Sequence, residues 1–193
     1  MENKAIIYTD GSCHGNPGPG GYAAIVLVNG VTREAHGSDW YTTNNRMELT
    51  AVIEGLKIIP DSGYAHIISD STYVVNPIQH GNFRNYAASS NHANADLWEK
   101  ILRLSAFHTL TAEWVKGHSG NKYNQRCDFL ANKEASRAEQ ESRIRRMVFR
   151  ALILDILATP EQISAQYGIK ELDIIRKYHQ LYLSYHFGGC RNG

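Results

Sequence analysis

The stretch YTDGSCHGNPGPGGYAAIV, residues 8–26, runs from apolar and β-branched residues into Asp10 and then into a segment dominated by glycine and proline. The runs KAIIYT (4–9) and YAAIVLV (22–28) are short, β-branched and aromatic, which is typical of strands. In this interpretation Asp10 ends the first strand. A loop that only reverses the chain needs fewer glycines, so we expect its exposed backbone to lie against something large.

Alternating strand and helix patterns continue through the first 138 residues. Asn29-Gly30 predicts a hairpin into a third strand, residues 31–41. The patterns that follow predict a helix from Asn44 to the stop at Pro60, a strand (64–69), a short helix (71–79), a polar exposed excursion (80–95), a helix (97–107), a strand (110–115) and a helix (121–138). A three-strand meander followed by strand–helix alternation predicts an α/β fold with a mixed five-stranded sheet flanked by helices.

Composition favours a globular chain without a membrane span. Of the 193 residues 42% are hydrophobic and 20% are charged, and no apolar run reaches the roughly 18 residues that cross a bilayer. The N-terminus does not resemble a secretory signal, and Cys13, Cys127 and Cys190 lie far apart, so we expect a reduced protein in the cytoplasm. A net charge of +1 is low for a nucleic-acid-binding protein, and a bound divalent cation would explain the many acids.

Four carboxylates form the candidate site. Asp10 and Asp70 each follow an apolar strand, and parallel neighbours would present both at one sheet edge. Glu48 lies early in the helix after TTNNR, and Asp128 lies in the last of these helices. Unpaired, the four would raise one another's pKa values, whereas two Mg²⁺ or Mn²⁺ ions would bind their oxygens. Taken singly, Asp70 also fits a turn or helix cap, Glu48 a solvated residue and Asp128 an ion pair; only the set favours a metal site.

The motifs TDGSCHGNPGPGGYA, TTNNRMELTAVIEGL, SDSTYV, DLW, WVKGHSG and NQRCDFLA, in this order, resemble ribonuclease H of the bacterial type 1 branch over about residues 3–138. The resemblance implies a ribonuclease H-like fold and hydrolysis of the RNA strand of RNA–DNA hybrids, which leaves 5′-phosphate and 3′-hydroxyl ends. It implies a two-metal mechanism, with two Mg²⁺ or Mn²⁺ ions per site when substrate is bound. The implied catalytic and metal-binding residues are Asp10, Glu48, Asp70 and Asp128. His118 matches a loop histidine that moves protons or assists product departure; a plain loop histidine is the alternative.

The resemblance also implies contacts with the hybrid from Cys13, Asn16, Thr43, Asn44 and Asn45, with Thr43 and Asn16 at a DNA phosphate. Helix capping for the two neighbouring asparagines, and packing for the cysteine, are the alternatives.

Two departures from the family concern substrate binding. The 80–95 segment carries a single arginine, Arg84, and no lysine or tryptophan, so we expect a weaker grip on phosphates. Thr72 stands where the family commonly has a glutamine.

Residues 139–193 form an additional helical segment beyond the resemblance, so we divide the chain into a catalytic domain (1–138) and a small all-α C-terminal extension. A helix is predicted over 136–157 with Arg143, Arg145, Arg146 and Arg150, and a helix-turn-helix pattern follows, starting at Thr159-Pro160. One hypothesis is that the extension binds duplex DNA or RNA. The alternative is a helical hairpin that packs on the catalytic domain or dimerises.

The function that these observations favour is a monomeric endonuclease that removes RNA primers or R-loops. Two alternatives stay open: a hybrid- or duplex-binding module that does not cleave, and another nuclease or strand-transfer enzyme on the same sheet. Cleavage tests on hybrid, double-stranded RNA and double-stranded DNA, each with Mg²⁺, would discriminate them.

Overall fold

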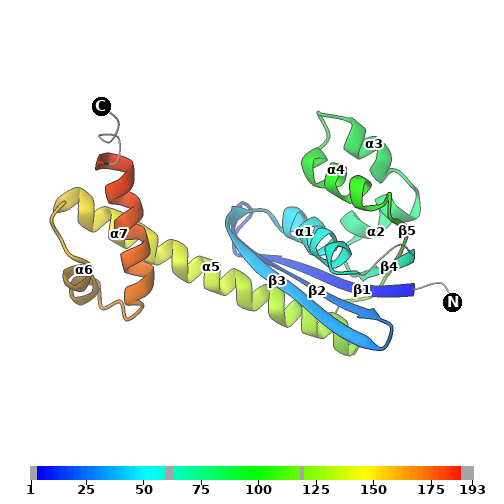
Figure 1. Ribbon diagram of the computed structural model, residues 1–193, viewed down its shortest axis with the longest axis horizontal. Helices are drawn as coiled ribbons and strands as arrows, with labels where there is room; N and C mark the ends of the chain where they lie inside the picture. The colour runs from blue at the N-terminus through cyan, green and yellow to red at the C-terminus, as the bar shows by residue number, and fades with distance from the viewer. Residues whose placement is uncertain (1–3, 60–62, 118–119, 188–193) are drawn as a thin grey trace. The chain divides into compact units, whose positions relative to one another are not determined.

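The computed structural model describes residues 4–59, 63–117 and 120–187 (Figure 1). The chain forms two compact units, Met1–Ala138 and Glu139–Gly193. Each unit has its own core and is treated by itself below. Within the described ranges, no helix combines the length and the apolar character that crossing a membrane requires.

The first unit is built on one five-stranded sheet in the order β3-β2-β1-β4-β5. The hairpin predicted at Asn29-Gly30 is present, and β1, β2 and β3 are antiparallel, while β4 and β5 run parallel to β1. This is the predicted mixed sheet. The strands are β1 (Lys4–Cys13), β2 (Gly18–Val28), β3 (Val31–Thr42), β4 (Gly63–Ser69) and β5 (His108–Trp114).

Helices cover both faces of this sheet, because its central strands alternate apolar residues between the two sides. Ile7 and Ile67 belong to the larger core cluster, which α1, α2 and α4 cover, and their neighbours Tyr8 and Ile68 pack with α5 on the other face (Figure 1). The helices of this unit are α1 (Asn44–Lys57), α2 (Thr72–Gln79), α3 (Phe83–Ala88), α4 (Ala95–Leu104) and the first part of α5 (Lys122–Leu154).

The glycine-rich stretch is largely strand, so the expectation that Asp10 ends the first strand is wrong. β1 continues to Cys13 and β2 begins at Gly18. The chain's own packing requires several of the glycines: a Cβ at Gly11 would lie 2.4 Å from the backbone nitrogen of Glu48. At Gly21 it would lie 2.3 Å from the carbonyl oxygen of Ala131 in α5. These glycines therefore let α1 and α5 approach the sheet. Their small size serves internal packing, whereas the composition had suggested contact with a large external ligand.

The 80–95 segment is more ordered than the predicted exposed excursion. It contains α3, whose Phe83 is buried at 4% exposure in the main core. Tyr86 stacks on His92 with ring centroids 3.8 Å apart and meets Trp98 of α4 edge-on at 5.9 Å. Phe83 and Tyr86 fix the segment against the core and α4, which the polar composition of the segment did not indicate.

The second unit is all-helical. The helices predicted over 121–138 and 136–157 are one continuous helix, α5, whose later turns pack with α6 (Pro160–Tyr167) and α7 (Leu172–Phe187) around Ile144, Val148, Ile163 and Ile175. Thr159 caps α6 as predicted, in a capping box with Gln162. Gly168 ends α6 at φ 64°, so two helices joined by a short turn are present.

Candidate metal centre

Three acids from three separate elements converge at one end of the sheet. Asp10 comes from β1, Glu48 from α1 and Asp70 from the residue after β4. One carboxylate oxygen from each lies within 4.8 Å of the other two. The parallel register explains the first pairing: Tyr8 lies beside Ile68, which places Asp10 and Asp70 side by side two residues further on.

The start of α1 sets the position of Glu48. Thr43 is the N-cap of this helix, and its hydroxyl oxygen accepts a hydrogen bond from the backbone N–H of Arg46 at 3.4 Å. The absent side chain at Gly11 lets the next turn lie directly against β1. Glu48 is consequently held at 4% exposure, one turn into the helix and beside Asp10.

The site is buried and strongly anionic. Burial and then the charges of Asp70 and Asp128 raise the pKa of Asp10 to about 7. Burial, followed by the charges of Asp10 and Asp70, holds the pKa of Glu48 well above its usual range. The Glu48 Oε2 atom is buried without a hydrogen-bond partner. No ion pair within the described ranges involves any of the three clustered acids. Closely spaced carboxylate oxygens without a cationic partner are the ligand set that Mg²⁺ and Mn²⁺ prefer.

Asp128 lies near this cluster but is not one of the three acids that meet in it. Its Oδ1 accepts a hydrogen bond from Asn132 Nδ2 at 2.8 Å, one turn further along α5. Its charge still contributes to the raised pKa of Asp10. The structure therefore brings together three of the four predicted acids and leaves the fourth at the edge of the site.

Three side chains near the acids were not predicted. Asn124 is buried at 3% exposure and donates from Nδ2 to Asp70 Oδ2 at 3.4 Å, and Trp114 Nε1 donates to the Asp70 carbonyl at 2.9 Å. Asn132 accepts from the Ser12 hydroxyl at 2.7 Å. Residues 124, 128 and 132 share one helical face, so their four-residue spacing was the available signal.

Two of the predicted substrate contacts, Asn16 and Asn44, are linked to the cluster by hydrogen bonds. Asn16 Oδ1 accepts from the backbone N–H of Asn44 at 3.3 Å, and Asn44 Nδ2 lies 3.5 Å from Glu48 Oε1. Asn45 is exposed. The side chain that caps the helix is Thr43, so the capping alternative for the two asparagines is wrong.

Two further predicted residues behave differently. The Cys13 thiol lies 3.5 Å from the carbonyl oxygens of Gly18 and Thr42 and is partly exposed. His118 lies outside the described residues. A Cβ at Gly117 would come 2.7 Å from Asp70 Oδ2, so Gly117 itself lies against the cluster.

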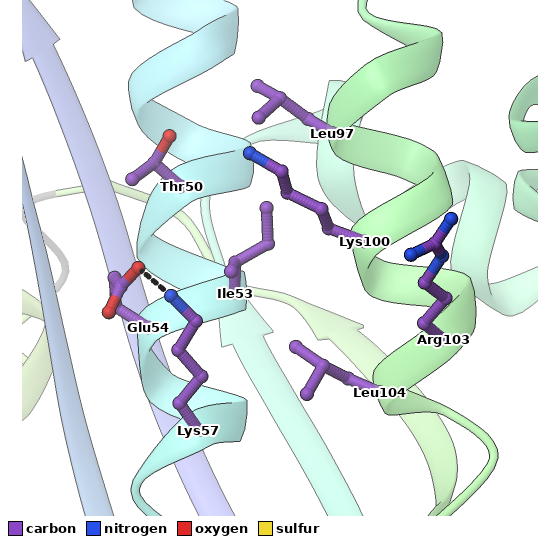
Figure 2. Close-up of a pocket in the computed structure, with 8 residues that line it drawn as sticks. All are labelled: Thr50, Ile53, Glu54, Lys57, Leu97, Lys100, Arg103 and Leu104. Carbon is purple, nitrogen blue, oxygen red and sulfur yellow. Dashed lines mark hydrogen bonds and ion pairs between the residues drawn. The ribbon is translucent and has the colours of Figure 1, made fainter.

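A separate groove of about 380 Å³ lies between α1 and α4 (Figure 2). Its floor is apolar, with Ile53 and Leu97, and Lys100 extends over it (Figure 2). Lys57 at its edge donates to Glu54 at 2.7 Å. None of the clustered acids lines this groove, so it is not part of the candidate metal centre.

Comparisons with known proteins identify the first unit. The family model described as RNase H matches residues 2–136. A ribonuclease H of Chlorobium luteolum is 49% identical over 138 residues, which cover 68% of this chain and 94% of the relative, and one of Chlorobium phaeobacteroides is 47% identical with the same coverage. A solved type 1 RNase H with the type 2 active-site motif has a TM-score of 0.61 and 27% identity, and covers 70% of this chain and 74% of its own.

Proposed function

Because the chain belongs to the ribonuclease H family of hydrolytic nucleases, we propose that it is an endonuclease that cuts the RNA strand of RNA–DNA hybrids and leaves 5′-phosphate and 3′-hydroxyl ends. The observation that carries this proposal is the cluster of Asp10, Glu48 and Asp70, with Glu48 Oε2 buried and unpartnered. Residues 1–138 are proposed as the catalytic domain and residues 139–193 as a separate extension.

Divalent cations fit this site. Glu48 Oε2 is buried without a hydrogen-bond partner, which costs free energy unless a cation binds this oxygen. We assign Asp10, Glu48 and Asp70 as ligands for two Mg²⁺ or Mn²⁺ ions, and Asp128 as the acid that joins them when the hybrid binds. When bound, such ions activate a water molecule and stabilise the departing 3′ oxygen.

The protein side chains position the ligands and the substrate. The backbone N–H of Gly11 donates to Asp10 Oδ1 at 2.8 Å, which orients that carboxylate, and Asn124 orients Asp70. Asn16 and Asn45 are exposed, and Asn16 accepts a hydrogen bond from the backbone N–H of Asn44. With Thr43, Asn44 and Cys13 they form the proposed substrate surface. Selectivity for RNA would come from contacts with 2′-hydroxyl groups, and His118 is proposed to move a proton or assist product departure.

The experiment incubates an end-labelled hybrid, double-stranded RNA and double-stranded DNA separately with the full chain and Mg²⁺ or Mn²⁺. We expect cleavage of the hybrid's RNA strand alone. Glu48→Gln keeps the size of the side chain but removes a ligand charge. Its loss of activity should exceed the roughly 10- to 100-fold that follows when a hydrogen-bond partner of a metal ligand is removed.

A control on the same helix is Glu54→Gln, because Glu54 is partly exposed and paired with Lys57. It should retain full activity. Substantial Mg²⁺-dependent cleavage by Glu48→Gln would contradict the site, and cleavage of duplex DNA would contradict the substrate.

The proposed cellular setting follows from the substrate. Hybrids arise at RNA primers and R-loops, so we propose removal of these structures in the cytoplasm by a monomer. Cys13 and Cys127 are both free thiols, which is compatible with a reducing compartment.

A further inference from the structure

Three arginines in the second unit form a cationic stripe on α5. Arg143, Arg146 and Arg150 are exposed, and none has a hydrogen bond, ion pair or ring contact with any residue in the described ranges. Their spacing of three and four residues places them on one helical face over about 10 Å of axis. Glu139 lies one turn before Arg143, so the two later arginines are further from an acid along the helix.

Arg145 does not belong to this stripe, although the sequence grouped it with the others. Its guanidinium lies over the rings of Phe149 and Tyr178, 5.4 and 5.9 Å from their centroids. Phe149 and Tyr178 pack edge to face at 6.2 Å as part of the core of this unit. Arg145 therefore has a structural role, and the exposed cations are the other three.

The helix-turn-helix arrangement does not supply a base-reading helix of the usual kind. In such motifs the N-terminal residues of the second helix meet the base edges. Here the first turn of α7 carries Asp173, whose side chain is 99% exposed and pairs with Arg176 at 3.6 Å, so this turn offers phosphates an acid and no cation. The cations of α7 are already paired, Arg176 with Glu161 at 3.1 Å and Lys177 with Glu141. Among the described arginines of this unit, the three without an acidic partner, Arg143, Arg146 and Arg150, lie on α5.

We propose that the stripe of Arg143, Arg146 and Arg150 binds the sugar–phosphate backbone of the RNA–DNA hybrid, without reading its sequence. The identity of this occupant rests on the proposed function, since the same chain carries a nucleic-acid hydrolase domain. A duplex carries a negative charge about every 1.7 Å of its axis, so about 10 Å of stripe faces several phosphates. Exposed guanidinium groups suit phosphate oxygens because they can donate two parallel hydrogen bonds.

The stripe compensates for the weak binding of nucleic-acid phosphates that we expect from the 80–95 segment of the first unit. The 80–95 segment holds one arginine, Arg84, and its guanidinium lies over the ring of Phe83 at 5.2 Å. A second cationic surface on the same chain keeps the hybrid at a high local concentration around the catalytic unit. This effect does not depend on a particular arrangement of the two units.

The test measures the affinity of a fluorescent hybrid for the full chain between 50 and 200 mM salt. An Asp10→Asn background keeps the hybrid intact. Changing the three stripe arginines to glutamine should weaken binding at 50 mM salt by about tenfold or more and reduce the salt slope by about 2 to 3, because each lost phosphate contact contributes about 0.7 to 0.9. The triple lysine variant should restore the slope. Hybrids of different sequence should be affected equally.

The control changes Arg176 and Lys177 to glutamine, which removes two cations of the same unit that already face carboxylates. It should leave the salt slope nearly unchanged. An unchanged salt slope in the triple glutamine variant would overturn the proposal. The proposal would also fail if this variant bound the hybrid as tightly as the unmodified stripe does but no longer bound phosphatidylserine vesicles. With Asp10 restored, the triple variant should cleave hybrid with a raised KM and an unchanged kcat. Absence of cleavage by the unmodified chain would instead refute the proposed function and leave the binding result to stand alone.

Discussion

Asp10→Asn should stabilise the metal-free protein at neutral and alkaline pH. Burial and neighbouring charges raise the pKa of Asp10 from 3.8 to about 7. The unfolded chain therefore ionises Asp10 above about pH 4, whereas the folded chain keeps the proton until about pH 7. The stability of the unmodified protein consequently falls over this window and levels off above it. A shift of about 3 pKa units corresponds to at most about 4 kcal/mol, because each unit is worth about 1.4 kcal/mol.

Asparagine keeps the Oδ1 acceptor for the Gly11 N–H but cannot ionise. We expect Asp10→Asn and the unmodified chain to be equally stable near pH 4 in EDTA, and the variant to be more stable by up to about 4 kcal/mol at pH 8. The assay is urea unfolding followed by tryptophan fluorescence, since Trp40, Trp98 and Trp114 all lie in the first unit. Excess Mg²⁺ should stabilise the unmodified chain through binding to the folded state, and it should stabilise the variant much less, because the variant lacks one ligand charge.

Asp39→Asn is the matched control, because Asp39 is exposed and its Oδ1 accepts only a local hydrogen bond from the backbone N–H of Tyr41. It should show no comparable gain at pH 8. If Asp10→Asn is no more stable than the unmodified chain at pH 8 in EDTA, burial and the neighbouring charges do not raise the pKa of Asp10 in the folded protein, and the reasoning is refuted.

Other variants test the packing. Gly21→Ala should lower the free energy of unfolding by about 1–3 kcal/mol or more, because its Cβ would lie 2.3 Å from the Ala131 carbonyl oxygen. Gly30→Ala should lower it by only about 1 kcal/mol, because the added Cβ meets open space and only the left-handed backbone at φ 74° is unfavourable. Urea unfolding would compare the two variants. Thr159→Ala removes the α6 cap and should cost about 1 kcal/mol in the unfolding of the second unit, measured by circular dichroism. Burial raises the pKa of the Cys127 thiol, so this thiol should resist thiol reagents at pH 8 until urea unfolds the first unit; rapid labelling of the folded protein would contradict that burial.

Local patterns predicted most of the sheet and the candidate site. Short β-branched and aromatic runs such as KAIIYT identified the strands, and Asn29-Gly30 identified the hairpin. Asp10 and Asp70 could be paired because parallel neighbouring strands bring equivalent positions together. These features depend on residues close in sequence or on a general rule of sheet geometry, so one sequence is sufficient to predict them.

Contacts between distant segments could not be predicted in the same way. Position 21 must be glycine because a Cβ there would meet the backbone of Ala131 in α5. The burial of Phe83 depends on the core cluster that includes Trp98. Asp128 shows a different difficulty: its helix was predicted, but the sequence pattern does not set the direction of its carboxylate, which accepts a hydrogen bond from Asn132. The unbroken α5 was predictable, because no glycine or proline interrupts residues 122–154.

The close contact between Gly11 and the backbone of Glu48 has a consequence for mutational screens. A single methyl group at position 11 would wedge the two segments apart, and with them two of the anionic side chains. Library selections for inactive clones should therefore recover substitutions there as often as at the acids themselves. Hydrolysis would be lost through the addition of inert carbon, with every reactive group still present in the polypeptide.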